Sequence, residues 1–205
     1  MLKRVWPMLS IVFVLALSGC ATTPPSKTDN ICDIFREKDG WYDDAADSRK
    51  EWGSPISVMM AIMHQESRFV AKAKPPRKKI LWVIPGPRPS TSFGYSQAKK
   101  STWAGYKRSA GRYGADRDDF GDAIDFIGWY NEQSNRRSGI AKNDAYRLYL
   151  AYHEGHGGYN RGTYQKKSWL ITVAKKVRDN AARYRSQLLK CEDDLKKSRG
   201  FFDWF

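Results

Sequence analysis

The sequence predicts a mainly α-helical domain, and three observations support this prediction. Apolar residues recur at the spacing of a helix face along most of the chain after residue 30. The length of 205 residues fits a single domain. The 8 Trp, 11 Tyr and 9 Phe residues supply enough bulky side chains to fill a core, which excludes a disordered chain.

The N-terminus has the pattern of an export signal. Lys3 and Arg4 precede an apolar stretch, residues 5–17, that is too short for a comfortable transmembrane helix. Small residues then stand directly before Cys20, a pattern that resembles the lipobox of bacterial lipoproteins. We therefore expect residues 1–19 to be removed and Cys20 to be lipidated. The alternative is an ordinary signal peptide that happens to contain a cysteine.

Residues 20–30 are polar and contain two prolines, so we expect a linker before a folded domain at residues 31–205. Helices are expected at residues 31–38, 54–69, 96–110, 119–134, 142–153 and 166–197. Residues 71–92 differ, because a β-branched and aromatic run at 80–84 is followed by Pro85-Gly86-Pro87. That pattern predicts a small strand or ribbon insertion, whose basic residues form either a solvated loop or an edge that binds a polymer.

The chain carries 36 Lys and Arg residues against 22 Asp and Glu, a net charge of +14. Removal of the signal takes away two cations and no acid, which leaves a charge of +12. Such a charge fits nucleic acid, an anionic membrane surface or an acidic polymer. Because an exported protein meets no chromosome, we disfavour nucleic acid and expect phospholipid headgroups or the cell wall as the anionic partner.

A carboxylate lies on the apolar face of the second expected helix. Ser54 is a good N-cap there, and Pro55 suits the first helical position. In a helical projection Glu66 falls about 40° from Ile62, in the middle of the apolar stripe. Because burial disfavours the charged form, the pKa of Glu66 should be raised, as a general acid requires. The alternative is a side chain that turns outward or pairs with Arg68.

Three short sequence blocks resemble the signatures of one family, the lytic transglycosylases with the goose-type-lysozyme-like fold. Glu66-Ser67-Arg68-Phe69 resembles their Glu-Ser-x-Phe, Gly94-Tyr95-Ser96-Gln97 is similar to their Gly-Leu-Met-Gln, and residues 151–157 are similar to their Ala-Tyr-Asn-Ala-Gly-x-Gly turn. The order and spacing of the blocks agree, and the resemblance covers about residues 50–185. His153 and Glu154 replace the family's Asn and Ala, and residues 169–177 lack the Tyr of its later Glu-Thr-x-x-Tyr motif.

The resemblance implies a lysozyme-like domain that acts as a peptidoglycan lytic transglycosylase. Such an enzyme cleaves the β-1,4 bond between N-acetylmuramic acid (MurNAc) and N-acetylglucosamine (GlcNAc) and forms 1,6-anhydroMurNAc. Glu66 would be the single catalytic carboxylate, first acid and then base, assisted by the substrate's acetamido group. No cofactor and no metal is implied. The candidate substrate contacts are Ser67, Gly94, Tyr95, Gln97, Tyr152 and Gly155, although Tyr152 fits the pattern of a core aromatic equally well.

Two other functions stay open. A hydrolytic muramidase on the same fold would need a base to activate water, and the candidates are Glu154 and the aspartates at 116, 118, 119, 122 and 125. A non-catalytic peptidoglycan-binding lipoprotein is the alternative from another class. His153 and His156 do not indicate a metal site, because they lack the i, i+4 spacing of helical zinc ligands.

The remaining expectations concern the two ends of the chain. Ala21 after Cys20 favours the periplasmic face of the outer membrane, where peptidoglycan strands are the expected partner. With Cys20 lipidated, Cys32 and Cys191 remain as an even pair, and we predict a disulfide between the first and last helices. Residues 201–205 carry four aromatics, which we expect either to pack on the domain or to dock on a membrane or a partner protein.

Overall fold

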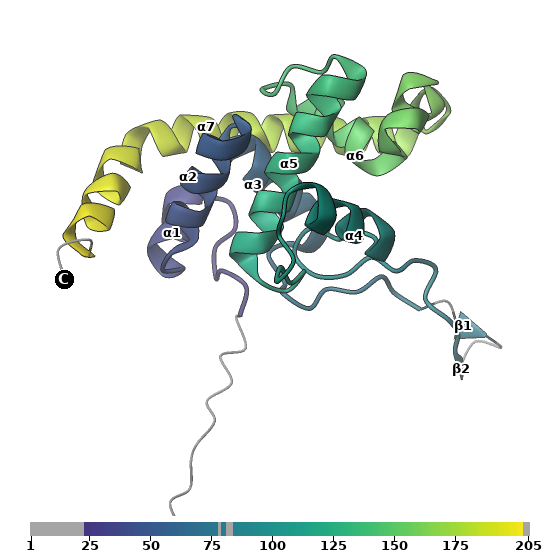
Figure 1. Ribbon diagram of the computed structural model, residues 1–205, viewed down its shortest axis with the longest axis horizontal. Coiled ribbons are helices and arrows are strands. Elements are labelled where there is room, and N and C mark those ends of the chain that lie inside the picture. Colours follow the sequence, from purple (N-terminus) through teal and green to yellow (C-terminus); the bar gives the residue numbers. More distant parts are fainter. Residues whose placement is uncertain (1–22, 78, 81–83, 203–205) are drawn as a thin grey trace, which may run out of the picture.

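The computed structural model describes residues 23–77, 79–80 and 84–202, and the mainly α-helical fold class is confirmed (Figure 1). The helices are α1 (Ile31–Glu37), α2 (Trp41–Trp52), α3 (Ile56–Ser67), α4 (Lys100–Ser109), α5 (Phe120–Ser138), α6 (Ala145–Asn160) and α7 (Ser168–Phe202), with a 3-10 turn, η1 (Thr163–Lys166), before α7. The expected signal, the lipidation site at Cys20 and the aromatic side chains of the C-terminal tail lie outside the described residues.

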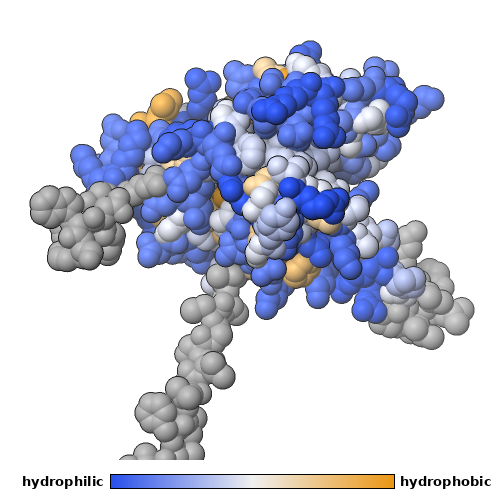
Figure 2. Space-filling model, viewed as in Figure 1, coloured by the Kyte–Doolittle hydropathy of each residue, from blue (hydrophilic) through white to orange (hydrophobic). Residues whose placement is uncertain are grey.

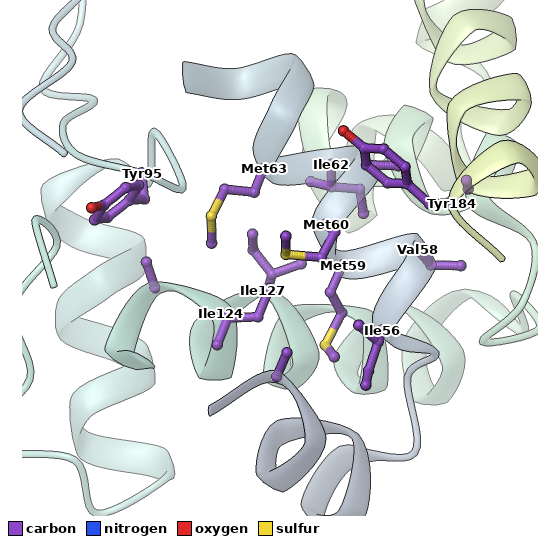
Figure 3. Packing of buried hydrophobic residues seen from close by; sticks show 14 of the residues in the cluster. Ile56, Val58, Met59, Met60, Ile62, Met63, Tyr95, Ile124, Ile127 and Tyr184 are labelled. Atoms are coloured by element: carbon purple, nitrogen blue, oxygen red, sulfur yellow. The ribbon is translucent and has the colours of Figure 1, made fainter. Parts of the chain in front are cut away.

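The core is built around α3 (Figure 3). All eight residues from Ile56 to Met63 are buried, so α3 is surrounded by protein rather than amphipathic. Its methionine and isoleucine side chains lie between Ile124 and Ile127 of α5 and Tyr184 of α7 (Figure 3). Full burial of each such side chain contributes roughly 1.5–3 kcal/mol, which fixes the position of the helix. Only the last turn of α3 reaches the edge of the core.

The start of α3 differs from the expected cap. Pro55 is the N-cap residue, and no side chain caps the first turn. The fully buried Ser54 hydroxyl instead accepts a hydrogen bond from Asn131 Nδ2 of α5 at 2.8 Å. The cap prediction was wrong because a partner distant in sequence occupies the hydroxyl.

The sequence pattern did not reveal α2. Small and polar side chains dilute its apolar period, since its buried residues are Trp41, Tyr42, Ala45, Ala46 and Ser48. These small residues allow a close approach to α5. A Cβ atom added to Gly128 of α5 would lie only 2.5 Å from Ser48 Oγ. The packing of α2 on α5 therefore depends on residues that carry little hydrophobic signal.

Several helix boundaries also shift from the predicted ones, among them those of α4 and α6. α4 begins at Lys100 instead of residue 96, because Gln97 has a left-handed backbone with φ 49° that no α-helix accommodates. α6 continues past the predicted end at residue 153 and reaches Asn160, with a break at Gly155.

The long helix α7 runs along one side of the body and packs against α1, α3 and α6 (Figure 1). A disulfide joins Cys32 of α1 to Cys191 of α7, the pair proposed from the cysteine count. Closing so long a loop contributes roughly 4–5 kcal/mol in the chain-entropy model, as an upper figure.

Most of the expected linker that the structure describes is docked on the domain. Pro25 is buried, and the backbone N–H and hydroxyl of Ser26 donate to the Glu37 carboxylate at 2.8 and 2.6 Å. The Tyr184 hydroxyl of α7 donates to the carbonyl of Thr28. Residues 25–30 thus belong to the folded unit, and the folded unit begins earlier than Ile31.

The insertion between α3 and α4 contains the expected ribbon. β1 (Lys79–Ile80) pairs antiparallel with β2 (Ile84–Pro85), and Figure 1 shows this pair extending away from the helices. The insertion is closed at its base, where the carbonyl of Ala73 accepts from the Gly94 N–H and from Gln97 Nε2, both at 3.0 Å.

Hydrophilic residues cover most of the face in Figure 2, and hydrophobic ones are scattered among them. Within residues 23–77, 79–80 and 84–202, no helix is both long and apolar enough to cross a membrane.

Candidate active site

Glu66 occupies the last turn of α3, immediately before an unusual turn of the backbone. Arg68 and Phe69 both have positive φ angles, 51° and 62°, and the Arg68 N–H closes the helix on the carbonyl of His64. Phe69 is fully buried and stacks on the His64 ring, with centroids 5.6 Å apart. A bulky residue keeps a left-handed conformation only where the surrounding packing fixes it. The turn therefore holds the end of α3, and with it Glu66, in a defined position.

The carboxyl group of Glu66 is held where it keeps a proton near neutral pH. Burial raises the pKa of Glu66 from its ordinary 4.5 to about 7, while a hydrogen bond with the Tyr149 hydroxyl acts in the opposite direction. No second carboxylate among the described residues contributes to this shift. Glu66 is thus the raised-pKa acid that its place in the apolar stripe predicts.

Two tyrosines of α6 lie close to this carboxyl group. Tyr149 is buried, and its own pKa is raised by burial and by the neighbouring Glu66. The Tyr152 hydroxyl donates to the carbonyl of Ser96 at 2.6 Å, and its ring packs edge-on against Tyr130 with centroids 5.0 Å apart. Glu66 also raises the pKa of Tyr152, after the larger effect of burial, so the two groups are close. Tyr152 consequently ties the third sequence block to the second, in addition to offering a partly exposed ring.

The second block forms a tight turn in which two residues have packing roles. Gly94 has φ +79°, and a Cβ there would lie 1.9 Å from the carbonyl oxygen of Arg117. The close approach of the neighbouring loop therefore requires a glycine here. Tyr95 is only 1% exposed and lies edge-on to the rings of Trp41 and Phe120. Its side chain cannot contact a glycan, so that expectation was wrong.

Gln97 and Ser67 are constrained by their hydrogen bonds. Gln97 Nε2 donates to Gly94 and Ala73 carbonyls at 2.8 and 3.0 Å, so both amide protons are used and only its side-chain oxygen could meet a sugar. Ser67 is buried, and its hydroxyl donates to the carbonyl of Met63 one turn back along α3. Ser67 therefore uses its hydroxyl proton within the helix, and a contact with substrate stays a prediction.

A groove begins at Gly155. The backbone of this residue (φ 71°, ψ 156°) interrupts α6, and a Cβ there would face open space. A cavity of about 440 Å³ begins at this break and runs between α4 and α5; its lining includes Thr102, Gly105, Trp129, Tyr130, Gln133 and Gly155. Because Tyr130 packs on Tyr152, this groove adjoins the tyrosines above Glu66.

The comparison with known families decides what this arrangement is. Residues 8–191 match the family model of the transglycosylase SLT domain. The chain belongs to this family. The SLT domain gives it the lysozyme-like helical fold and a lytic-transglycosylase-type, peptidoglycan-degrading function. Searches of curated proteins and of solved structures found no significant match.

Glu154 forms a closed ionic cluster. Its carboxylate accepts from Lys167 Nζ at 2.7 Å, from His153 Nδ1 at 3.0 Å and from the Thr163 hydroxyl. Burial acts to raise the pKa of Glu154, but these hydrogen bonds outweigh it and hold the pKa at about 2. A carboxylate this acidic and this fully bound is a poor general base.

The aspartates around the start of α5 serve the SLT fold rather than Glu66. Asp119 caps α5 by accepting from the Asp122 N–H at 2.9 Å. Asp125 accepts from Trp52 Nε1 at 2.6 Å, from the Tyr106 hydroxyl at 2.5 Å and from Arg112 Nε at 3.1 Å. Neither group affects the pKa of Glu66.

The histidines all have protein partners. His64 Nδ1 pairs with Asn180 Nδ2 at 2.9 Å, and His156 Nε2 pairs with the Ser134 hydroxyl at 3.0 Å. His153 is bound to Glu154, as described above. These contacts are structural and place none of the three rings on Glu66.

Tyr149 is the functional residue that sequence reasoning missed. It stands beside Leu148 in a helical apolar pattern, where an aromatic residue is most simply read as core. Its spacing of three from Tyr152 places both on one face of α6. That spacing was the available signal.

Proposed function

We propose that this SLT domain cleaves the β-1,4 bond between MurNAc and GlcNAc and closes a 1,6-anhydro ring on MurNAc, with Glu66 as acid and then base. The observation that carries the proposal is the half-buried Glu66 side chain, whose carboxyl pKa is raised to about 7 with no second carboxylate among the described residues acting on it. An acid that must also serve as a base works best when its pKa lies near the working pH.

In the first step, protonated Glu66 donates its proton to the glycosidic oxygen as the bond from that oxygen to the anomeric carbon breaks. The acetamido oxygen of the substrate stabilises the positive charge that develops at the anomeric carbon. In the second step, ionised Glu66 removes the proton of the 6-hydroxyl group, whose oxygen bonds to the anomeric carbon and displaces the acetamido oxygen. Glu66 ends with the proton it began with, and no water is consumed.

The same observations weigh against a hydrolytic muramidase. Hydrolases of the common two-carboxylate kinds place a second carboxyl group within several ångströms of the first, as base or nucleophile. Glu154 has a pKa of about 2 and three hydrogen-bond partners, and Asp119 and Asp125 are occupied in the fold. The groove that begins at Gly155 offers a path for a glycan strand beside the Tyr149 and Tyr152 side chains.

Product analysis and one substitution test the proposal. Fragments released from purified peptidoglycan by the wild-type domain should end in 1,6-anhydroMurNAc and resist borohydride reduction. Glu66→Gln keeps the shape of the side chain but cannot donate a proton, so cleavage should fall by two or more orders of magnitude while strand binding persists. Glu51→Gln is the matched control, because Glu51 pairs with Arg112 near the surface and should leave cleavage unchanged.

Other outcomes of this experiment would replace the proposal. A reducible MurNAc end indicates a muramidase. Full activity in Glu66→Gln removes Glu66 from the mechanism, and no cleavage by the wild type on several peptidoglycan types indicates a binding protein.

We also propose that Cys20 is lipidated and that the lipid holds the domain at the periplasmic face of the outer membrane. The support is the sequence alone, namely the small residues before Cys20 and Ala21 after it. The wild type should fractionate with membranes and take up a clickable fatty acid, and Cys20→Ser should do neither. A wild-type protein that stays soluble would contradict the anchor.

A further inference from the structure

The positive charge of the mature chain is concentrated in one stretch. Residues 67–115 contain twelve Lys and Arg residues and no Asp or Glu, whereas the rest of the chain after residue 19 contains 22 of each sign. This stretch begins directly after Glu66 and includes the insertion and α4, which lie on the same side of the body (Figure 1). The excess positive charge of this one stretch therefore equals the whole net charge of +12.

Few of these cations form ion pairs among the residues that the structure describes. Among the described residues of the stretch, only Arg112 has carboxylate partners, Glu51 and Asp125. Lys100 and Arg108, both exposed on α4, have none among the residues that the structure describes. Concentrated charge of one sign opposes folding through self-repulsion and attracts ligands of the opposite sign. The arrangement fits an anionic partner.

A groove lies within this basic region. It has a volume of about 490 Å³ and lies between α4 and the loop at 112–118; its lining includes Phe93, Lys100, Trp103, Lys107, Arg108 and Tyr113. Tyr113 is 72% exposed, which is unusual for so large a ring. The Phe93 ring lies near two cations, with Lys74 Nζ 5.3 Å and Arg117 Cζ 5.1 Å from its centroid. The groove thus combines aromatic faces with several cations.

The lining of the groove also includes two acids, Asp116 and Asp118. A concave site that has four cations, two carboxylates and aromatic faces is suited to a chain with several carboxylates, some amino or amide groups and short apolar side chains. A peptide has this composition. A membrane surface would instead require an apolar face that could enter the lipid.

The groove and the Glu66 site share one segment of chain. Phe93 lines the groove and forms a β-bridge with Ala98, and Arg117 Nη1 donates to the Ala98 carbonyl at 3.0 Å. Between those positions, the carbonyl of Ser96 accepts the Tyr152 hydroxyl beside Glu66. The segment that lines the groove at Phe93 therefore continues within a few residues to the carbonyl that binds Tyr152 beside Glu66.

We propose that the groove between α4 and residues 112–118 binds the carboxylate-bearing peptide stem of the peptidoglycan strand. This inference rests on the proposed function, since it takes the strand at Glu66 as its starting point. Lys100 and Arg108 attract the stem carboxylates, and the Tyr113 ring packs on the stem.

The test compares two forms of the glycan strand, with peptide stems and after their removal by an amidase. Affinities are measured in the Glu66→Gln background, so that cleavage does not interfere. Lys100→Gln combined with Arg108→Gln should lower the preference for stem-bearing strands by about tenfold, as expected for the loss of two exposed charge contacts. Tyr113→Ala should lower it several-fold. Lys196→Gln with Lys197→Gln removes the same charge from α7 and should leave the preference unchanged.

Three results would overturn the proposal. The first is that the Lys100→Gln, Arg108→Gln variant binds both strand types more weakly by the same factor, and the second is that it binds both as tightly as before. The third is that the variant loses binding to anionic phospholipid vesicles while its strand binding stays intact, which would assign the region to a membrane. Cleavage of stem-free strands by the wild type is measured separately. That activity decides the proposed function independently of the groove.

Discussion

Glu66 and Glu154 are both carboxyl groups with little access to water, yet their pKa values are shifted in opposite directions. The pKa of Glu66 is raised to about 7 and that of Glu154 is lowered to about 2, although burial acts to raise both. The difference lies in the neighbours. Glu66 has one neutral hydroxyl partner, Tyr149, whereas Glu154 is bound by a cation, a histidine and a hydroxyl. Hydrogen-bond donors, and not depth alone, decide which buried carboxyl group can act as an acid.

Exchanging Glu154 for its amide should destabilise the fold at neutral pH. Because the folded pKa of about 2 lies below the ordinary 4.5, ionised Glu154 stabilises the fold above pH 4.5, and this contribution is lost as the pH falls through about 2. Lys167 is 40% exposed, so water screens the pair. We expect Glu154→Gln to lower the free energy of unfolding by roughly 1–3 kcal/mol at pH 7, measured by urea denaturation, with the difference disappearing near pH 2.

The same exchange at Glu66 should have the opposite sign. Here the folded pKa lies above the ordinary one. The contribution of protonated Glu66 to the free energy of unfolding is therefore fully present below pH 4.5 and is lost as the pH rises through about 7. At pH 8, urea denaturation should give Glu66→Gln a free energy of unfolding roughly 1–3 kcal/mol above that of the wild type. At pH 4 the two proteins should be equally stable. If both amide variants were destabilised at pH 8, the two sites would not differ as described.

The smallest effect concerns the pH dependence of cleavage. kcat/KM should fall above about pH 7, as free Glu66 loses its catalytic proton. The Tyr149 hydroxyl lowers the pKa of Glu66, so in Tyr149→Phe this fall in kcat/KM should occur at a pH higher by about half to one unit. Tyr146→Phe, on the same helix, should leave it in place. If the fall in kcat/KM of Tyr149→Phe occurred at the same pH or at a lower pH, the hydroxyl would not act on Glu66 as described.

The features that could be predicted from sequence are those set by local pattern. The apolar stripe of α3 indicated both the helix and the unusual position of Glu66, and the β-branched run indicated the paired strands at 79–80 and 84–85. Those signals arise within a few turns of chain. The order of the three sequence blocks then indicated the family, which the family match confirms.

The features that escaped prediction depend on partners far away in sequence. Whether Ser54 caps a helix depends on Asn131, and whether Tyr95 meets a sugar depends on Trp41 and Phe120. Tyr149 could be assigned to Glu66 only once α6 was placed against α3. In each case the residue type allowed two roles, and tertiary packing selected one.

The docked segment at residues 25–30 has a consequence for where the enzyme can work. Ser26 is bound to Glu37 and Thr28 to Tyr184, so a lipid at Cys20 would be separated from the folded domain by only six peptide steps. Six fully extended steps span at most roughly 20 Å. With so short a connection to its lipid, the domain would stay close to the membrane surface. Glycan strands would have to come within that distance to be cleaved, so the spacing between membrane and wall would affect the rate of cleavage.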